Sequence, residues 1–166
     1  MADRIHLEIV TPKGRALDVS ADEVTAPGES GEFGVLPGHM PMLAALRTGT
    51  VSWRTGSETQ KCAISGGFAE AGSDKLLILT EDYVVPSGVN PVEVRKSMTE
   101  LDGELAKVDP KESPAAQLAR RKSLAERHNW FAAQLELYGE PAPPTIWIDD
   151  AAQVQASSDE SSADQN

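Results

Sequence analysis

The chain has 166 residues, 40% of them hydrophobic and 25% charged, with a formal net charge of -11 at pH 7. This length accommodates one main core and an appendage, and the composition is that of an ordinary globular protein. The negative charge would repel phosphate backbones and anionic lipid surfaces, so it argues against nucleic-acid binding and electrostatic membrane attachment and favours protein partners.

Residues 1–86 carry the pattern of short strands. Ile5, Leu7 and Ile9 alternate with polar residues, as in a strand that buries one face. The continuous apolar run over 76–79 predicts a strand that is covered on both sides. Because turn signals rich in glycine and proline separate such runs, we predict a mainly β N-terminal sandwich over residues 1–86.

Neither a leader nor a membrane span is apparent in the sequence. The N-terminal segment lacks the apolar stretch of a signal peptide, and no apolar run approaches about 18 residues. We therefore expect that the protein does not insert itself into a membrane. Cys62 is the only cysteine, which excludes an internal disulfide and favours a buried thiol in a reducing compartment.

After residue 88 the hydrophobic period changes from two to about 3.6, as in a helix. Asn90 is suited to the N-cap, Pro91 to the first helical position and Glu93 to a capping box. Asp109 and Pro110 are predicted to end this helix. The apolar residues of its expected buried face are Val94, Met98, Leu101, Leu105 and Val108.

A second helix is predicted from Ser113 as N-cap and Pro114 at the first position to Tyr138, with Gly139 as its stop. The short connection favours antiparallel packing, so residues 90–138 are predicted to form a C-terminal antiparallel α-helical hairpin.

Residues 140–166 are predicted to form a disordered acidic tail, because they are rich in proline, serine and acids and no lysine or arginine follows Arg127. The tail contains one apolar cluster, Ile146, Trp147 and Ile148. Two interpretations stay open for it: a docking motif for a partner, or a tethered segment that covers its own domain.

The sequence offers no constellation for catalysis. His6, His39 and His128 lie in three different predicted elements, so their spacing gives no metal-binding pair. Gly28, Gly31 and Gly34 match no phosphate-binding pattern, and no lysine follows them. We therefore expect no enzyme activity, no cofactor and no metal.

Two blocks resemble a known family. Residues 31–46 read GEFGVLPGHMPMLAAL, and this block resembles the most distinctive motif of the epsilon subunit of the F-type ATP synthase, called delta in mitochondria. A second block, Ser65-Gly66-Gly67 followed by Glu70, resembles the SGGxxE motif of that family. The order of a sandwich followed by a hairpin is also that of the family.

The resemblance implies a non-catalytic rotor subunit of the central stalk in a proton-translocating ATP synthase, coupling the gamma subunit to the c-ring. It would be peripheral to the membrane, on the cytoplasmic side of the bacterial inner membrane. The resemblance places the c-ring contact at Glu29 and Glu32. It places the gamma contact at Val35, Leu36, His39 and Met40.

The resemblance also implies a regulatory hairpin, which extends along gamma and blocks rotation by meeting the catalytic alpha/beta head. Four basic residues of the second helix would make those contacts: Arg120, Arg121, Lys122 and Arg127. The alternative interpretation is a solvated helix whose apolar end packs on the first helix.

Some members of the family bind ATP through a motif of the form I/L-D-x-x-R-A. Only Arg95 is retained here, because Val92 and Lys96 replace the aspartate and the alanine. A valine cannot accept the hydrogen bonds of a carboxylate, so nucleotide binding is not expected. The alternative function is a free-standing nucleotide-binding sensor module, which would need no gamma partner.

Overall fold

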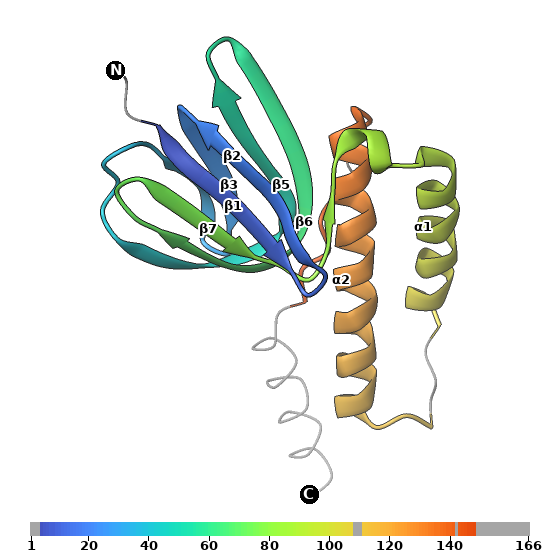
Figure 1. The fold of residues 1–166 in the computed structure, drawn as a ribbon. Coiled ribbons are helices and arrows are strands. Elements are labelled where there is room, and N and C mark those ends of the chain that lie inside the picture. Colours follow the sequence, from blue (N-terminus) through green and yellow to red (C-terminus); the bar gives the residue numbers. More distant parts are fainter. Residues whose placement is uncertain (1–3, 108–110, 142, 149–166) are drawn as a thin grey trace, which may run out of the picture.

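The structure is a computed structural model that describes residues 4–107, 111–141 and 143–148 (Figure 1). Its strands are β1 Ile5–Thr11, β2 Gly14–Ala21, β3 Glu23–Gly28, β4 Gly31–Val35, β5 Met42–Thr55, β6 Glu58–Ala71, β7 Lys75–Leu79 and β8 Tyr83–Val84. Its helices are the short 3₁₀ helix η1 Pro86–Gly88 and the α-helices α1 Pro91–Leu105 and α2 Pro114–Tyr138. In this described part of the chain, no helix is both long and apolar enough to cross a membrane.

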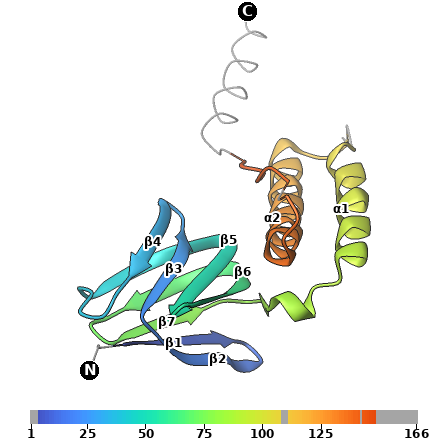
Figure 2. The ribbon, with the colours of Figure 1, turned by 90° about the horizontal axis from the view of Figure 1, so that it is seen from above.

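The strands form one hydrogen-bonded sheet in the order β2-β1-β7-β6-β5-β3-β4, with β8 paired to β6. All pairs are antiparallel except β1 with β7. The sheet folds over into two layers, because β1 contacts β3 and β2 contacts β5 although neither pair is adjacent in this order. Figure 2 shows β3 and β4 in one layer and β1 and β2 in the other. The predicted sandwich is confirmed.

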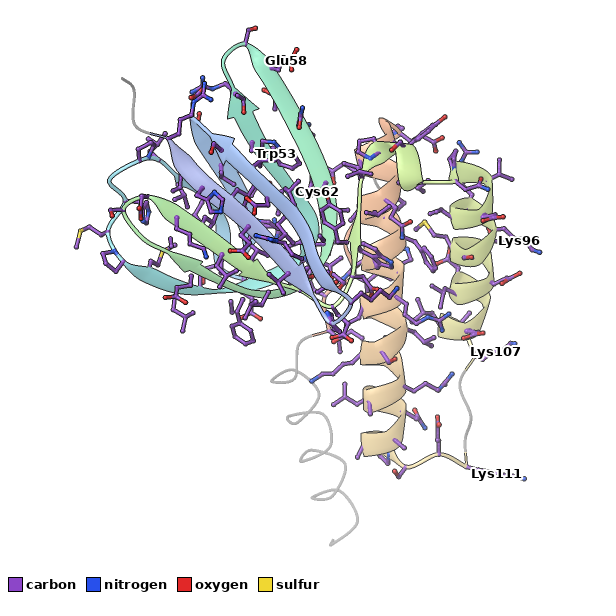
Figure 3. The ribbon with its side chains drawn as sticks, in the orientation of Figure 1. Trp53, Glu58, Cys62, Lys96, Lys107 and Lys111 are labelled. Atoms are coloured by element: carbon purple, nitrogen blue, oxygen red, sulfur yellow. The ribbon has the colours of Figure 1, made fainter. Side chains whose placement is uncertain are left out.

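The core lies between these two layers. Ile5, Leu7 and Ile9 are completely buried, as their alternation with polar residues predicts. Trp53 and Cys62, which Figure 3 labels, belong to the same core.

The run over 76–79 corrects one prediction, because β7 is covered on one face only. Leu76 and Ile78 are buried in the core, whereas Leu77 is half-buried and Leu79 is 48% exposed. β7 is hydrogen-bonded between β1 and β6, so its neighbours protect its edges but leave its outer face open. An apolar run therefore marks an exposed apolar surface here rather than a doubly covered strand.

The two predicted helices form the antiparallel hairpin, with the predicted caps (Figure 1). The Asn90 side chain accepts from the Glu93 N–H at 3.4 Å, and the Ser113 hydroxyl accepts from the Ala116 N–H at 3.3 Å. At the end of α2, Gly139 adopts a left-handed φ of 99°, which suits the glycine at a helix C-terminus.

The end of α1 differs from the prediction. The helix ends at Leu105, before Asp109 and Pro110, which lie with Val108 outside the described residues. At this end Arg120 on α2 donates to the carbonyl of Glu104 at 3.5 Å and to that of Lys107 at 2.7 Å. The Glu104 carbonyl also accepts from the Lys107 N–H at 3.2 Å, so both carbonyls have partners at the helix terminus.

α2 lies between α1 and the sandwich, contacting β5 and β6 on one side and α1 on the other (Figures 1 and 2). Its buried residues include several alanines, which let the helix approach the sheet closely. This second core comprises Ala63 from β6, Val89, Val94 and Met98 from the start of the hairpin, and Ala132, Ala133, Leu135 and Leu137 from α2. The hairpin therefore rests on the sandwich mainly through α2.

The predicted disordered tail, residues 140–166, falls largely outside the described residues, which leave out 142 and 149–166. Its disorder stays a prediction. Residues 143–148 are described, and they lie beside α2 and β5.

Candidate functional site

The segment between β4 and β5 is fixed by backbone and side-chain hydrogen bonds. The Gly38 N–H donates to the carbonyl of Ser73 at 2.6 Å, and the His39 N–H donates to that of Leu36 at 3.1 Å. The Nδ1 atom of His39 donates to the carbonyl of Met40 at 2.7 Å. His39 thus stabilises the bend that presents Leu36 and Met40 to solvent.

An apolar surface continues from this bend across the outer face of the sheet, and we call it the outer apolar face. Its large side chains are between 48% and 79% exposed: Leu36, Met40, Leu43, Phe68 and Leu79. Phe68 on β6 is paired with Ala45 on β5 and with Leu79 on β7, so these strands bring their side chains onto one face. Large exposed apolar side chains that gather in this way mark an interaction surface.

Gly67 is the residue that lets β6 pass so close to β7. A Cβ atom at this position would lie 1.9 Å from the carbonyl oxygen of Leu79, and the φ of 120° is one that side chains rarely adopt. The glycine pair of the SGGxxE block therefore serves the geometry of the strand that carries Phe68.

The rim of this face carries an ion pair. Lys75 lies 2.7 Å from the carboxylate of Glu8 on the neighbouring strand. The hydrogen bond from Lys75, with smaller contributions from nearby positive charges, holds the pKa of Glu8 below its ordinary value. An apolar centre with a charged rim is the general anatomy of a protein–protein interface.

Of the four residues predicted to contact gamma, three lie at the bend. Leu36 and Met40 are exposed and His39 is half-buried, but Val35 is fully buried in the sandwich core. Val35 ends β4, and its side chain points inward while that of the next residue points outward. The side chain of Val35 is therefore a core residue and offers no surface to a partner.

Glu29 and Glu32 are both exposed at the tip of the β3–β4 hairpin. The Glu29 N–H donates to the carbonyl of Ala45 at 3.0 Å, which fixes the tip against β5. The two carboxylates thus lie at one end of the sandwich.

The four basic residues of α2 have different surroundings. Arg120 is half-buried and pairs with Glu112 at 3.2 Å, besides closing the end of α1. Arg121 and Arg127 are exposed, and Lys122 and Arg127 line a cavity of about 650 Å³ between α2 and the sandwich. The structure thus gives Arg120 a structural role in the hairpin and leaves the guanidinium groups of Arg121 and Arg127 on the surface.

Arg95 is engaged within the hairpin. Its guanidinium pairs with the carboxylate of Glu140 through two hydrogen bonds, one of them 3.0 Å long. This ion pair joins the start of α1 to the residues that follow α2. Val92, at the position of the missing aspartate, is an exposed apolar residue, so the geometry gives no support to the nucleotide-sensor alternative.

The three histidines are separated in the fold. His6 pairs with Asp18 at 3.2 Å on the outer strands, His39 holds the bend, and buried His128 faces Asp102 at 3.8 Å between the helices. Across the described ranges, no three histidine, cysteine or acidic side chains gather as metal ligands.

Sequence reasoning missed Leu43, Phe68 and Leu79 as candidate contact residues. Phe68 lies inside the second motif block and Leu79 ends a continuous apolar run. The sequence shows both features, but large apolar residues in predicted strands are usually buried in the core. Their exposure follows only from the register of β5, β6 and β7.

Residues 4–86 match the family described as "ATP synthase, Delta/Epsilon chain, beta-sandwich domain". Among curated proteins, the chain is 34% identical over 110 residues to ATP synthase epsilon chain 2 of Syntrophotalea carbinolica, an alignment that covers 66% of this chain and 80% of that protein. It is 38% identical over 126 residues to the ATP synthase epsilon chain of Nitratidesulfovibrio vulgaris strain DP4, covering 75% of this chain and 94% of the relative.

Two solved structures share the fold. One is a chain of the Euglena gracilis mitochondrial ATP synthase, OSCP/F1/c-ring, with a TM-score of 0.65 and 22% identity over 80% of this chain and 79% of that chain. The other is from the central stalk and c-ring of the Tetrahymena thermophila mitochondrial ATP synthase, with a TM-score of 0.54 and 16% identity over 78% of this chain and 96% of that chain.

Proposed function

Because this chain belongs to the delta/epsilon family of ATP synthase subunits, we propose that it is the rotor piece that couples the gamma subunit to the c-ring in the central stalk of a proton-translocating ATP synthase. It is a non-catalytic subunit, and its work is to hold two partners together. Its contribution to rotation is therefore mechanical, made through surfaces rather than through reacting groups.

The outer apolar face is the surface that we propose binds the gamma subunit. Leu36 and Met40 at the bend and Leu43, Phe68 and Leu79 on the sheet expose side chains that water disfavours, and a partner would remove them from water. The face lies on paired strands, so it is preorganised and loses little conformational entropy on binding. Rigid contacts of this kind suit a junction that must transmit torque.

The c-ring contact is assigned to Glu29 and Glu32. Both carboxylates are exposed at the tip of a hairpin that the bond from Glu29 to Ala45 fixes in place. The chain would then remain peripheral to the membrane, on the cytoplasmic face of the bacterial inner membrane, held there only by its protein partners.

Co-elution tests the coupling role. The chain mixed with purified gamma is expected to leave a sizing column as a one-to-one complex, without added nucleotide. A chain that elutes alone with gamma present, and that is stabilised against thermal unfolding by millimolar ATP, would instead support the sensor alternative.

The hairpin is proposed to inhibit ATP hydrolysis when it leaves the sandwich and extends toward the catalytic alpha/beta head. Arg121 and Arg127 support this, because both are exposed and neither has an ion-pair or hydrogen-bond partner among the described residues. Lys122 lies between them in the sequence. Each exposed ion pair is worth only about 0.2 to 1 kcal/mol, so the expected inhibition is reversible.

The test is the ATP hydrolysis rate of the catalytic head with gamma and this chain. Replacing Arg121 and Arg127 together by alanine should raise the rate. Lys61→Ala is the matched control, because Lys61 is an exposed cation on β6, away from the hairpin's basic cluster. Equal rates for the double variant and the control would refute the inhibitory assignment. Arg120→Ala is less informative, because Arg120 also holds the hairpin together.

A further inference from the structure

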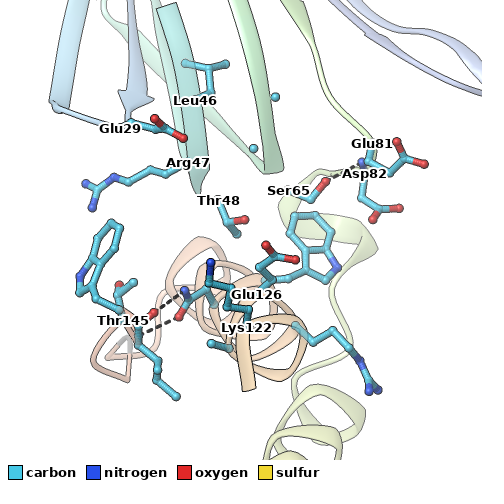
Figure 4. A pocket seen from close by; sticks show the side chains of 18 of the residues that line it. Glu29, Leu46, Arg47, Thr48, Ser65, Glu81, Asp82, Lys122, Glu126 and Thr145 are labelled. Carbon is cyan, nitrogen blue, oxygen red and sulfur yellow. Dashed lines mark hydrogen bonds between the residues drawn. The ribbon is translucent and has the colours of Figure 1, made fainter. Parts of the chain in front are cut away.

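Residues 143–148, which we call the strap, return from the end of α2 and lie between this helix and the sandwich. Pro143 and Thr145 line a small cavity of about 80 Å³ together with residues of β3, β5 and α2. Figure 4 shows Thr145 opposite Arg47 and Thr48 of β5 across the larger cavity. In the apolar cluster of the tail, Ile146 and Ile148 are half-buried and Trp147 is 65% exposed, so the cluster lies against its own chain without being fully covered by it.

Asn129 on α2 binds the backbone of the strap. Its Nδ2 donates to the carbonyl of Ile146 at 3.0 Å, and its Oδ1 accepts from the Ile146 N–H at 2.9 Å, as the dashed lines in Figure 4 show. One side-chain amide thus satisfies both polar groups of one strap residue. Asparagine has a low helix propensity, and the two hydrogen bonds to the strap offset the cost of placing it inside α2.

Arg47 on β5 binds the strap from the sandwich side. The centre of its guanidinium lies 5.7 Å from the centroid of the Trp147 ring, within the range of a cation–π contact. Its Nε atom is buried and has no hydrogen-bond partner among the described residues. The Arg47 guanidinium therefore contacts the Trp147 ring, while its Nε atom makes no hydrogen bond to an oxygen of the described residues.

The contacts of the strap fall into two groups: those that join it to α2 and those that join it to the sandwich. The bonds from Asn129 join the strap to α2 and can move with the helix. The contact between Arg47 and Trp147, and the packing of Pro143 and Thr145 near β3 and β5, join the strap to the sandwich. The second group must break before α2 can separate from β5 and β6.

We propose that the strap is a latch: by binding α2 through Asn129 and β5 through Arg47, it lowers the fraction of molecules in which the hairpin is released from the sandwich. The latch itself is a property of the isolated chain. Its consequence for catalysis, that it opposes inhibition of ATP hydrolysis, rests on the proposed function of the hairpin.

Two-colour energy transfer in the isolated full chain tests the latch. Dyes on Glu58→Cys, at the start of β6, and Lys96→Cys, on α1, report the distance between sandwich and hairpin; both positions are exposed (Figure 3). Trp147→Ala should raise the released fraction about threefold to tenfold, the effect of losing a partly exposed cation–π contact and its packing. Trp147→Phe keeps a ring for Arg47 and should stay near the wild-type value.

Truncation gives a second measurement that does not depend on one side chain. A chain that ends at Pro141 loses the strap and should be released at least as often as Trp147→Ala, whereas a chain that ends at Ile148 keeps the strap and should match the full chain. Wild-type released fractions for both Trp147→Ala and the chain ending at Pro141 would overturn the latch.

The rate of ATP hydrolysis separates the two proposals. If Trp147→Ala raises the released fraction and lowers the hydrolysis rate of the assembled complex, the latch and the inhibitory hairpin are both supported. If the released fraction rises and the rate is unchanged, the latch stands and the inhibitory role is wrong.

Discussion

Replacing Phe68 by alanine should weaken the binding of gamma about 30-fold and leave the fold intact. Phe68 is 58% exposed, and an aromatic side chain offers roughly 200 Å² of surface, so about 120 Å² is available to a partner. At about 25 cal/mol per Å², its burial is worth at most about 3 kcal/mol. Alanine retains part of this, which leaves a loss of about 2 kcal/mol, or roughly 30-fold in Kd.

The cost to the isolated fold should be smaller. Phe68 is not in the core, and what the free chain loses is mainly its cross-strand pairing with Leu79, a contact of about 0.2 to 1 kcal/mol. The matched control is Tyr138→Ala, which removes an aromatic ring of similar exposure, 51%, from the end of α2. Titration calorimetry against purified gamma measures both variants. A Phe68→Ala chain that binds gamma as tightly as the wild type would refute the assignment of the outer apolar face.

Three further predictions concern the sandwich. Gly67→Ala should lower the free energy of unfolding by about 3 kcal/mol or more in a denaturant titration, because its Cβ would meet a β7 carbonyl; Gly34→Ala, which has open space, should change it by less than about 0.5 kcal/mol. Burial raises the pKa of Cys62 to about 12, so a thiol reagent at pH 8 should leave the native chain unmodified and label it only in denaturant; equal rates would contradict the buried thiol. The Gly56 N–H, 2.6 Å away, and nearby arginines hold the pKa of Asp22 below its ordinary 3.8, so this carboxylate stabilises the fold above about pH 4 and loses that effect as the pH falls through its folded pKa. Asp22→Asn should therefore flatten the loss of stability on acidification, and an unchanged pH profile would count against this account.

The sequence by itself determined the features that depend on near neighbours along the chain. Ile5, Leu7 and Ile9 bury one face because side chains alternate along any strand. Asn90 and Ser113 cap their helices because each side chain reaches an N–H only three residues away. The motif blocks were also sufficient to indicate the family, which the comparisons confirm.

The tertiary structure decided which apolar residues face inward and where distant segments meet. Val35 was expected at the surface and lies in the core, whereas Leu79 was expected in a covered strand and lies on the outer apolar face. The contact of Arg47 with Trp147 joins residues a hundred positions apart. Hydrophobicity reports only that a side chain avoids water, and the direction in which it does so is set by strand register and by the packing of α2, both of which depend on contacts between residues far apart in sequence.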